Sequence, residues 1–138
     1  MRILIVEDEE LIIKVMNKTF SFYGECEIAK NSKEAMMLYL AGIEKNTPFG
    51  LILLDIALSS GSGLSVLKQI RKREKKAGAK SHKEGVKIIM TTGNRKESVV
   101  KESIASGCNG YLLKPLNPKM VKEILQKLKI TPLKNSDS

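Results

Sequence analysis

The sequence predicts an α/β fold in which helices cover both faces of a doubly wound, five-stranded parallel sheet. Short apolar runs alternate with longer segments whose apolar residues recur at helical spacing, and this alternation extends through most of the 138 residues. Several runs are unbroken and rich in β-branched residues, which is typical of strands buried on both faces. Alternating strands and helices favour a parallel sheet with its connecting helices on both sides.

The strands are expected where the apolar runs are shortest and most continuous. In chain order they are residues 3–6, 25–29, 51–54, 86–90 and 111–113. The second of these is the weakest, because charged residues interrupt it. The third run leads directly into Asp55, and the fifth leads into Lys114 and Pro115.

Each strand is followed by a predicted helix. Gly24 ends the first helix, Asn31 or Ser32 caps the second, and Asn117 caps the last, with Pro118 in its first turn. The third helix starts near Leu64 and continues into a basic segment. In the fourth and fifth helices the residues expected to face the core are Val99, Val100, Ile104, Met120, Val121, Ile124, Leu125 and Leu128.

Length and composition indicate one domain over residues 1–130, followed by a polar tail at 131–138. No apolar run approaches the roughly 18 residues that a membrane span needs, and the N-terminus does not read as a secretory signal. Cys26 and Cys108 stand far apart and His82 is the single histidine, so a zinc site and a Cys/His catalytic pair are excluded. A reduced, cytoplasmic setting is therefore expected.

The positive charge is concentrated in one segment. The chain has a formal net charge of +9, and residues 68–87 contain nine Lys and Arg against two Glu. Two interpretations stay open: a solvated helix end and loop, or a docking patch for an acidic partner or nucleic acid. Because no aromatic residue lies in this segment, a stacking platform is absent and nucleic acid is not the expected partner.

Five polar residues follow predicted strands: Glu7 and Asp8 the first, Asp55 the third, Thr92 the fourth and Lys114 the fifth. Functional sites of open parallel sheets lie at the carboxyl ends of the strands, so these residues can meet in one pocket. Taken singly, each is also typical of a helix cap or a loop. Their order at successive strand ends is what favours a site.

The chemistry of this set is coherent. Clustered carboxylates repel one another unless a cation joins them, and oxygen ligands suit Mg²⁺. A lysine can neutralise a phosphoryl group, and the hydroxyl and backbone N–H at Thr92 and Gly93 can hydrogen-bond to its oxygens. An aspartate can itself act as a nucleophile and form an acyl phosphate.

The chain resembles the receiver domain of two-component response regulators, of the single-domain, chemotaxis-regulator type. The matching motifs are Ile3-Leu4-Ile5-Val6-Glu7-Asp8-Glu9, Leu51-Ile52-Leu53-Leu54-Asp55, Ile88-Ile89-Met90-Thr91-Thr92-Gly93 and Gly110-Tyr111-Leu112-Leu113-Lys114-Pro115. The resemblance implies a flavodoxin-like (βα)5 fold with strand order 2-1-3-4-5. It also implies a phosphorylation-controlled signalling switch that accepts a phosphoryl group from a histidine kinase or phosphotransfer protein, in the cytoplasm.

The resemblance assigns a role to each site residue. Asp55 would be the phosphoacceptor, Asp8 and the carbonyl of Ala57 would bind Mg²⁺ with Asp55, and Glu7 would support the ion through water. Thr92 and Lys114 would bind the phosphoryl group. Tyr111 would be the aromatic switch residue, and Ala57 and Asn94 would flank the path of the hydrolytic water. The residues with these implied roles are Glu7, Asp8, Asp55, Ala57, Thr92, Asn94, Tyr111 and Lys114.

Further expectations come from the same family. The chain would catalyse its own phosphorylation and slow dephosphorylation without being a conventional enzyme. Its protein target would dock on the face formed by the fourth helix, fifth strand and fifth helix. The Lys114–Pro115 bond is expected to be cis. The sequence departs from the family at Ser59, where a proline is usual, and in a longer segment at 75–85.

The same residues also bear on four other functions. A phosphate-binding NTPase is excluded because the chain lacks the G-x-x-x-x-G-K-[ST] motif. An aspartyl-phosphate hydrolase would need a second aspartate where this chain has Ala57, and a flavin module is disfavoured by the 4% aromatic content. A phosphorylation-independent adaptor with the same fold and a basic docking patch stays as the alternative.

Overall fold

A computed structural model of the chain describes residues 1–58, 60–93 and 97–133. Its five strands are β1 (Arg2–Val6), β2 (Glu25–Ala29), β3 (Leu51–Asp55), β4 (Lys87–Thr92) and β5 (Gly110–Leu113). Its helices are α1 (Glu10–Phe20), α2 (Ser32–Glu44), α3 (Gly63–Lys76), the short 3-10 helix η1 (His82–Glu84), α4 (Glu97–Ala105) and α5 (Pro118–Lys127). Asn31 caps α2 and Asn117 caps α5, as predicted.

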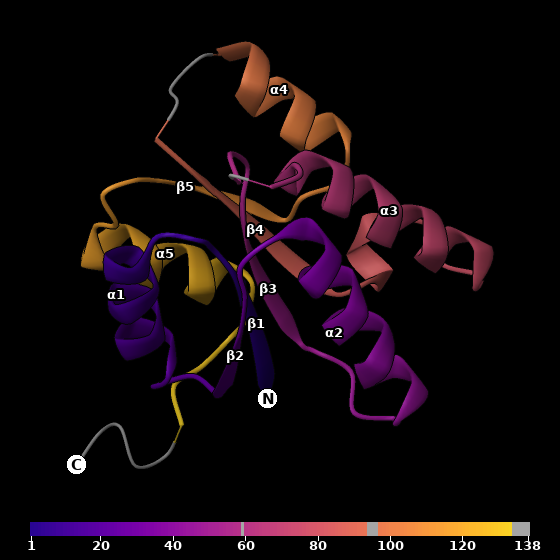
Figure 1. Ribbon diagram of the computed structural model, residues 1–138, viewed down its shortest axis with the longest axis horizontal. Helices are drawn as coiled ribbons and strands as arrows, with labels where there is room; N and C mark the ends of the chain where they lie inside the picture. The colour runs from indigo at the N-terminus through magenta and orange to yellow at the C-terminus, as the bar shows by residue number, and fades with distance from the viewer. Residues whose placement is uncertain (59, 94–96, 134–138) are drawn as a thin grey trace.

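The strands form one parallel sheet in the order β2-β1-β3-β4-β5. This confirms the doubly wound, flavodoxin-like prediction. Helices α1 and α5 cover one face of the sheet, and α2, α3 and α4 cover the other (Figure 1). No helix in the described part of the chain is both long and apolar enough to cross a membrane.

Successive side chains of each central strand enter two different cores. In β1, Leu4 and Val6 pack with α2 and α3, whereas Ile3 and Ile5 pack with α1 and α5. Both sets are fully buried, which explains why the strand sequences are continuous apolar runs and do not alternate with polar residues. Each fully buried aliphatic side chain contributes about 1.5–3 kcal/mol relative to an exposed one.

The register of the sheet brings the strand ends together. Val6 pairs with Leu54, Asp55 pairs with Thr91, and Thr92 pairs with Leu113. Glu7, Asp55, Thr92 and Lys114 therefore lie at the same edge of the sheet, although more than 100 positions separate the first from the last.

Two helix faces differ from the prediction. Ile104 is 61% exposed and Met120 is 53% exposed, so the expectation that they face the core is wrong. In α4 the buried position is Ser103, whose hydroxyl donates to the carbonyl of Val99 at 3.0 Å and so loses no hydrogen bond on burial. Helical spacing predicts that an apolar stripe exists but does not fix where its edges lie.

The fourth strand also begins later than predicted. Val86 precedes β4, because its N–H donates to the carboxylate of Glu74 at 2.7 Å and is not part of the sheet ladder. The peptide bond between Lys114 and Pro115 is cis, as predicted.

Candidate functional site

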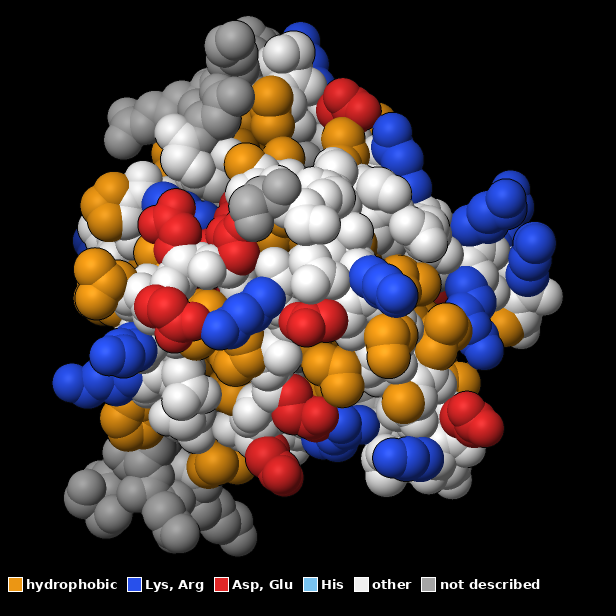
Figure 2. Space-filling model, viewed as in Figure 1, with side chains coloured by type: hydrophobic (Ala, Val, Ile, Leu, Met, Phe, Trp, Pro, Cys, Tyr) orange, Lys and Arg blue, Asp and Glu red, His pale blue; other side chains and the backbone are white. Residues whose placement is uncertain are grey.

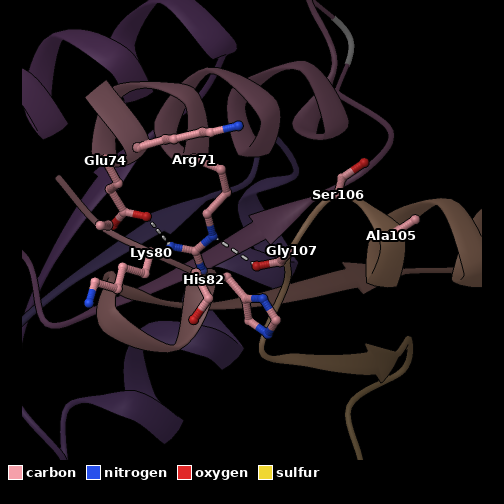
Figure 3. A pocket seen from close by; sticks show the side chains of 10 residues that line it. Arg71, Glu74, Lys80, His82, Ala105, Ser106 and Gly107 are labelled. Carbon is pink, nitrogen blue, oxygen red and sulfur yellow. Dashed lines mark hydrogen bonds and ion pairs between the residues drawn. The ribbon is translucent and has the colours of Figure 1, made fainter. Parts of the chain in front are cut away.

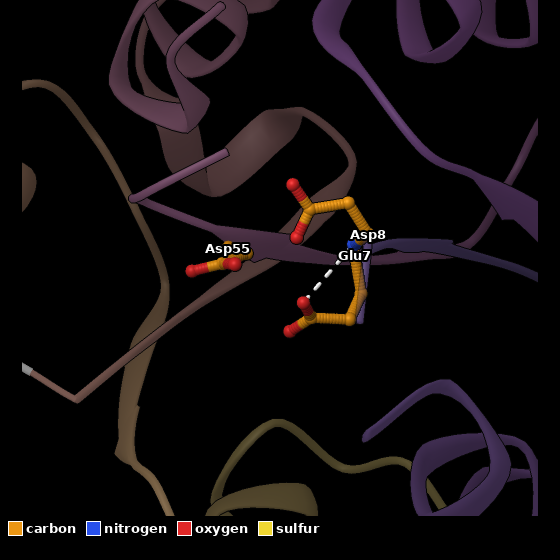
Figure 4. Close-up of side chains that lie close together, drawn as sticks. All are labelled: Glu7, Asp8 and Asp55. Carbon is orange, nitrogen blue, oxygen red and sulfur yellow. Dashed lines mark hydrogen bonds between the residues drawn. The ribbon is translucent and has the colours of Figure 1, made fainter. Parts of the chain in front are cut away.

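Three carboxylates converge at the carboxyl edge of the sheet. One carboxylate oxygen from each of Glu7, Asp8 and Asp55 lies within 4.8 Å of the other two, and Figure 4 shows the three side chains close together. Glu7 and Asp8 directly follow β1, and Asp55 is the last residue of the neighbouring β3. Glu7 and Asp55 are buried and Asp8 is half-buried, so the three carboxylates are largely withdrawn from solvent. We call this cluster, with Lys114, the acidic pocket.

Local hydrogen bonds orient two of these acids. The backbone N–H groups of Asp8 and Glu9 donate to Oε2 of Glu7 at 3.0 and 3.2 Å. The N–H of Ala57 donates to Oδ1 of Asp55 at 3.1 Å. The chain that leaves each strand therefore turns back onto the carboxylate and holds it in place.

Gly63 allows the loop after Asp55 to close. Its N–H donates to the carbonyl of Ile56 at 3.1 Å, and a Cβ atom at this position would lie 1.9 Å from the carbonyl oxygen of Asp55. Any larger residue would push the start of α3 away from the end of β3. A glycine at the first helical position is a signal of such a close approach, but sequence reasoning missed that Gly63 supports the site.

Lys114 supplies the positive charge of the pocket. Its Nζ lies 2.6 Å from Oε1 of Glu7 and 3.1 Å from Oδ2 of Asp55. The bond between Lys114 and Glu7 was missed by sequence reasoning, because nothing local in the sequence links residues 107 positions apart.

Burial and the neighbouring charges shift the pKa values of Asp55 and Lys114. Burial raises the pKa of Asp55 to about 6, and the negative charge of Glu7 acts in the same direction, while Lys114 partly offsets both. Burial alone would lower the pKa of Lys114, but its hydrogen bond to Glu7 and its interaction with Asp55 raise it overall. One ammonium group therefore does not compensate the carboxylates around it, and the pocket retains an excess of negative charge.

Thr92 and Tyr111 form a second group beside the acids. Thr92 is buried at the end of β4, and its carbonyl accepts a hydrogen bond from the N–H of Lys114 at 2.8 Å. Tyr111 lies half-buried on the adjacent β5 and makes a side-chain hydrogen bond with Thr92. Burial raises the pKa of Tyr111, and the bond with Thr92 acts against this shift.

The structure thus brings Glu7, Asp8, Asp55 and Lys114 into one cluster, with Ala57 bonded to Asp55 and the Thr92–Tyr111 pair alongside. Asn94, for which a role in dephosphorylation was expected, and Ser59, the departure in the loop, lie outside the described residues.

The comparisons with known proteins agree with one another. The family model described as "Response regulator receiver domain" matches residues 3–126. A "Chemotaxis protein CheY homolog" from Campylobacter jejuni is 26% identical, over 91% of this chain and 90% of that protein. The "Hybrid signal transduction histidine kinase G" of Dictyostelium discoideum is 30% identical over 92% of this chain, which spans only 4% of the kinase. Among solved structures, a CheY-like receiver domain protein from Methanospirillum hungatei superimposes with a TM-score of 0.72 at 33% identity, over 93% of each chain.

Proposed function

Because the chain belongs to the response regulator receiver domain family, we propose that it is a phosphorylation-controlled switch whose Asp55 accepts a phosphoryl group. The observation that carries the proposal is the placement of Lys114 Nζ 2.6 Å from Glu7 and 3.1 Å from Asp55, in a pocket with three convergent carboxylates. Such a pocket provides a nucleophile, a cation for the phosphoryl oxygens and ligands for a metal ion.

The pocket fits Mg²⁺. Its donors are all oxygen atoms, which hard divalent cations prefer. Burial, followed by the negative charge of Glu7, raises the pKa of Asp55, and a bound cation would favour the ionised carboxylate against both effects. Asp8, Asp55 and the carbonyl of Ala57 would hold the ion, with Glu7 supporting it through water, and bound Mg²⁺ would supply charge neutralisation at the phosphoryl oxygens.

In the proposed transfer, a carboxylate oxygen of Asp55 forms a bond to phosphorus while the bond from phosphorus to a histidine nitrogen of the donor breaks. The product is an acyl phosphate, and the donor histidine is released. Lys114 binds one phosphoryl oxygen, and the Thr92 hydroxyl with the Gly93 N–H binds another. A histidine kinase or phosphotransfer protein is the proposed donor, in the cytoplasm.

The proposed output passes through Thr92 and Tyr111. A phosphoryl oxygen that draws the Thr92 hydroxyl inward would compete with its hydrogen bond to Tyr111 and alter the position of that ring. Tyr111 lies on β5, between α4 and α5 along the chain, and each of these three elements carries an exposed apolar residue: Ile104, Leu113 and Met120. This face is the proposed docking site of the protein target.

The proposal is tested with Mg²⁺ and either acetyl phosphate or beryllofluoride, followed by NMR and intact-protein mass. We expect amide shifts at Asp55, Thr92 and Tyr111, and the mass of one added phosphoryl group with acetyl phosphate. Asp55→Asn should abolish both signals, whereas the matched charge control Glu123→Gln, at an exposed position of α5, should keep them. An unmodified parent protein would contradict the proposal and favour the phosphorylation-independent adaptor.

A further inference from the structure

The C-terminal half of α3 and the loop that follows it form a face rich in unpaired cations. We call this the basic face and define it by six residues: Lys72, Arg73, Lys75, Lys76, Lys80 and Lys83. The five lysines are exposed, and none of the six side chains has an ion-pair partner within residues 1–58, 60–93 and 97–133. Figure 2 shows Lys and Arg side chains gathered at the edge of the molecule where α3 ends.

The loop that carries part of this face is held by a buried network. Arg71 donates to the carbonyl of Gly107 at 2.8 Å and pairs with Glu74 at 2.6 Å (Figure 3). It also donates to the carbonyl of Val86 at 2.9 Å. Arg71 also donates to Oδ1 of Asn109 at 2.8 Å. The side chains of Arg71 and Glu74 are only 11% and 13% exposed. Their charges therefore pair with each other inside the protein and do not add to the charge of its surface.

Further bonds fix the loop itself. The second oxygen of Glu74 accepts from the N–H of Val86 at 2.7 Å, and the backbone N–H of Ala79 donates to the carbonyl of Glu74 at 3.0 Å. The N–H of Lys83 donates to the hydroxyl of Ser81 at 3.2 Å at the start of η1. The lysines therefore project from a positioned backbone, which lowers the entropy cost of holding them together in a complex.

A hollow lies within this region. It has a volume of about 180 Å³ and lies between the last turns of α3 and α4. Lys75, Lys80, His82 and Ser106 are among the residues that line it (Figure 3). Arg71 and Glu74 also line the hollow, but they pair with each other, so the lining charges without such a partner are those of Lys75 and Lys80. Together with the His82 imidazole and the Ser106 hydroxyl, this surplus of positive charge suits the end of an acidic side chain.

The basic face is remote from the acidic pocket. Helix α3 begins next to Asp55 and runs for 14 residues, which is about 20 Å at a rise of 1.5 Å per residue. The basic face lies at the far end of this helix and before β4 begins, at the opposite edge of the sheet. The charges of the basic face are therefore too far away to take part in the chemistry of the acidic pocket.

From these observations we propose that the basic face is a docking surface for an acidic segment of a partner protein. Unpaired, exposed and preorganised lysines attract carboxylates over distances of about a Debye length, and the hollow accepts one of them at short range. Nucleic acid fits less well, because residues 68–87 contain no aromatic ring for base stacking. The exposed Glu84 also lies among the lysines and would repel a continuous phosphate backbone, whereas a peptide can place neutral residues opposite it.

The test compares two variants that lose the same charge. Lys75, Lys76, Lys80 and Lys83 are replaced by Gln in the first. Exposed lysines elsewhere, Lys18, Lys45, Lys122 and Lys127, are replaced by Gln in the control. Both variants have a formal net charge of +5, four below the parent value of +9. The probe is a short fluorescein-labelled peptide in which Glu alternates with Ser and Gly, and the same peptide with Gln in place of Glu is the negative control.

We expect the parent protein to bind the Glu peptide, and the first variant to lose affinity by about 10-fold or more at low salt, on the basis of a few-fold loss for each exposed charge. The control variant should lose less than about 2-fold, and binding should weaken steeply between about 50 and 300 mM salt. The first variant should still be phosphorylated by acetyl phosphate, which shows that it is folded and separates this result from the function of Asp55. Equal losses in the two variants, salt-independent binding, no binding by the parent, or tighter binding of a DNA oligonucleotide than of the peptide would each overturn the proposal.

Discussion

Asp55→Asn should stabilise the protein at neutral pH when Mg²⁺ is absent. Asp55 is 3% exposed and shares the single ammonium of Lys114 with Glu7. Burial, followed by the charge of Glu7, raises the pKa of Asp55 from 3.8 to about 6. An asparagine keeps an oxygen that can accept the hydrogen bond from Ala57 N–H but removes the buried charge.

The magnitude follows from the pKa shift. A rise of about two units corresponds to about 3 kcal/mol of preference for the protonated carboxyl in the folded protein. Between about pH 4 and pH 6, the folded protein keeps a proton on Asp55 that the unfolded chain has released, so the free energy of unfolding decreases as the pH rises. Asparagine does not titrate. The stability difference between variant and parent should therefore widen by up to about 3 kcal/mol across this window and stay constant above it.

Urea unfolding followed by circular dichroism, at several values from about pH 4.5 to pH 8, measures this difference. The control Glu123→Gln removes a negative charge from an exposed position and should show no such widening. Mg²⁺ should raise the unfolding free energy of the parent and leave the Asp55→Asn variant nearly unchanged, because the proposed site exists only in the folded protein and uses the Asp55 carboxylate as a ligand. A stability difference that does not depend on pH, or a less stable variant at pH 8, would refute the charge argument.

Three further predictions concern the same pocket. Asp8→Ala should abolish Mg²⁺ binding and phosphorylation while the protein stays folded, and unchanged Mg²⁺ affinity in a titration would remove Asp8 from the ligand set. Thr92→Ala should uncouple Tyr111 from the phosphoryl group, so that ¹³C-labelled Tyr111 gives the same ring signals with and without beryllofluoride; a beryllofluoride-dependent shift in this variant would place the coupling elsewhere. Replacing Ala57 by Asn and Asn94 by Glu together should shorten the lifetime of the acyl phosphate by about 10-fold if water alignment gains about 1.4 kcal/mol, and an unchanged decay rate of the phosphorylated protein would point to another control of water access.

Much of the fold was predictable because local patterns and the sheet type agree. A strand buried on both faces must be apolar throughout, and this made β1, β3 and β4 recognisable from Ile3, Leu51 and Ile88 onward. Once the sheet is parallel, residues that follow its strands must share an edge, so the meeting of Asp8 and Asp55 was predictable without coordinates.

Boundaries and helix faces were less predictable, because neighbours decide them. Val86 is a β-branched residue in an apolar run, which is typical of a strand. Its N–H donates to the carboxylate of Glu74, however, so β4 begins one residue later. Ile104 continues the apolar pattern of α4 but is exposed, whereas the neighbouring Ser103 is buried. The hydrogen bond from the Ser103 hydroxyl to the carbonyl of Val99 makes this burial tolerable.

The sequence by itself determined the fold class, the approximate positions of the buried strands and the residue types of the acidic pocket, since all of these follow from short-range patterns. Only the tertiary structure decided which charges pair. Lys114 bonds to both Glu7 and Asp55, and Arg71 pairs with Glu74 inside the protein, while Lys75 and Lys80 are exposed at its surface. The reason is physical: the strength of an ionic contact depends on the distance and burial that packing sets, and two residues 107 positions apart carry no local trace of either.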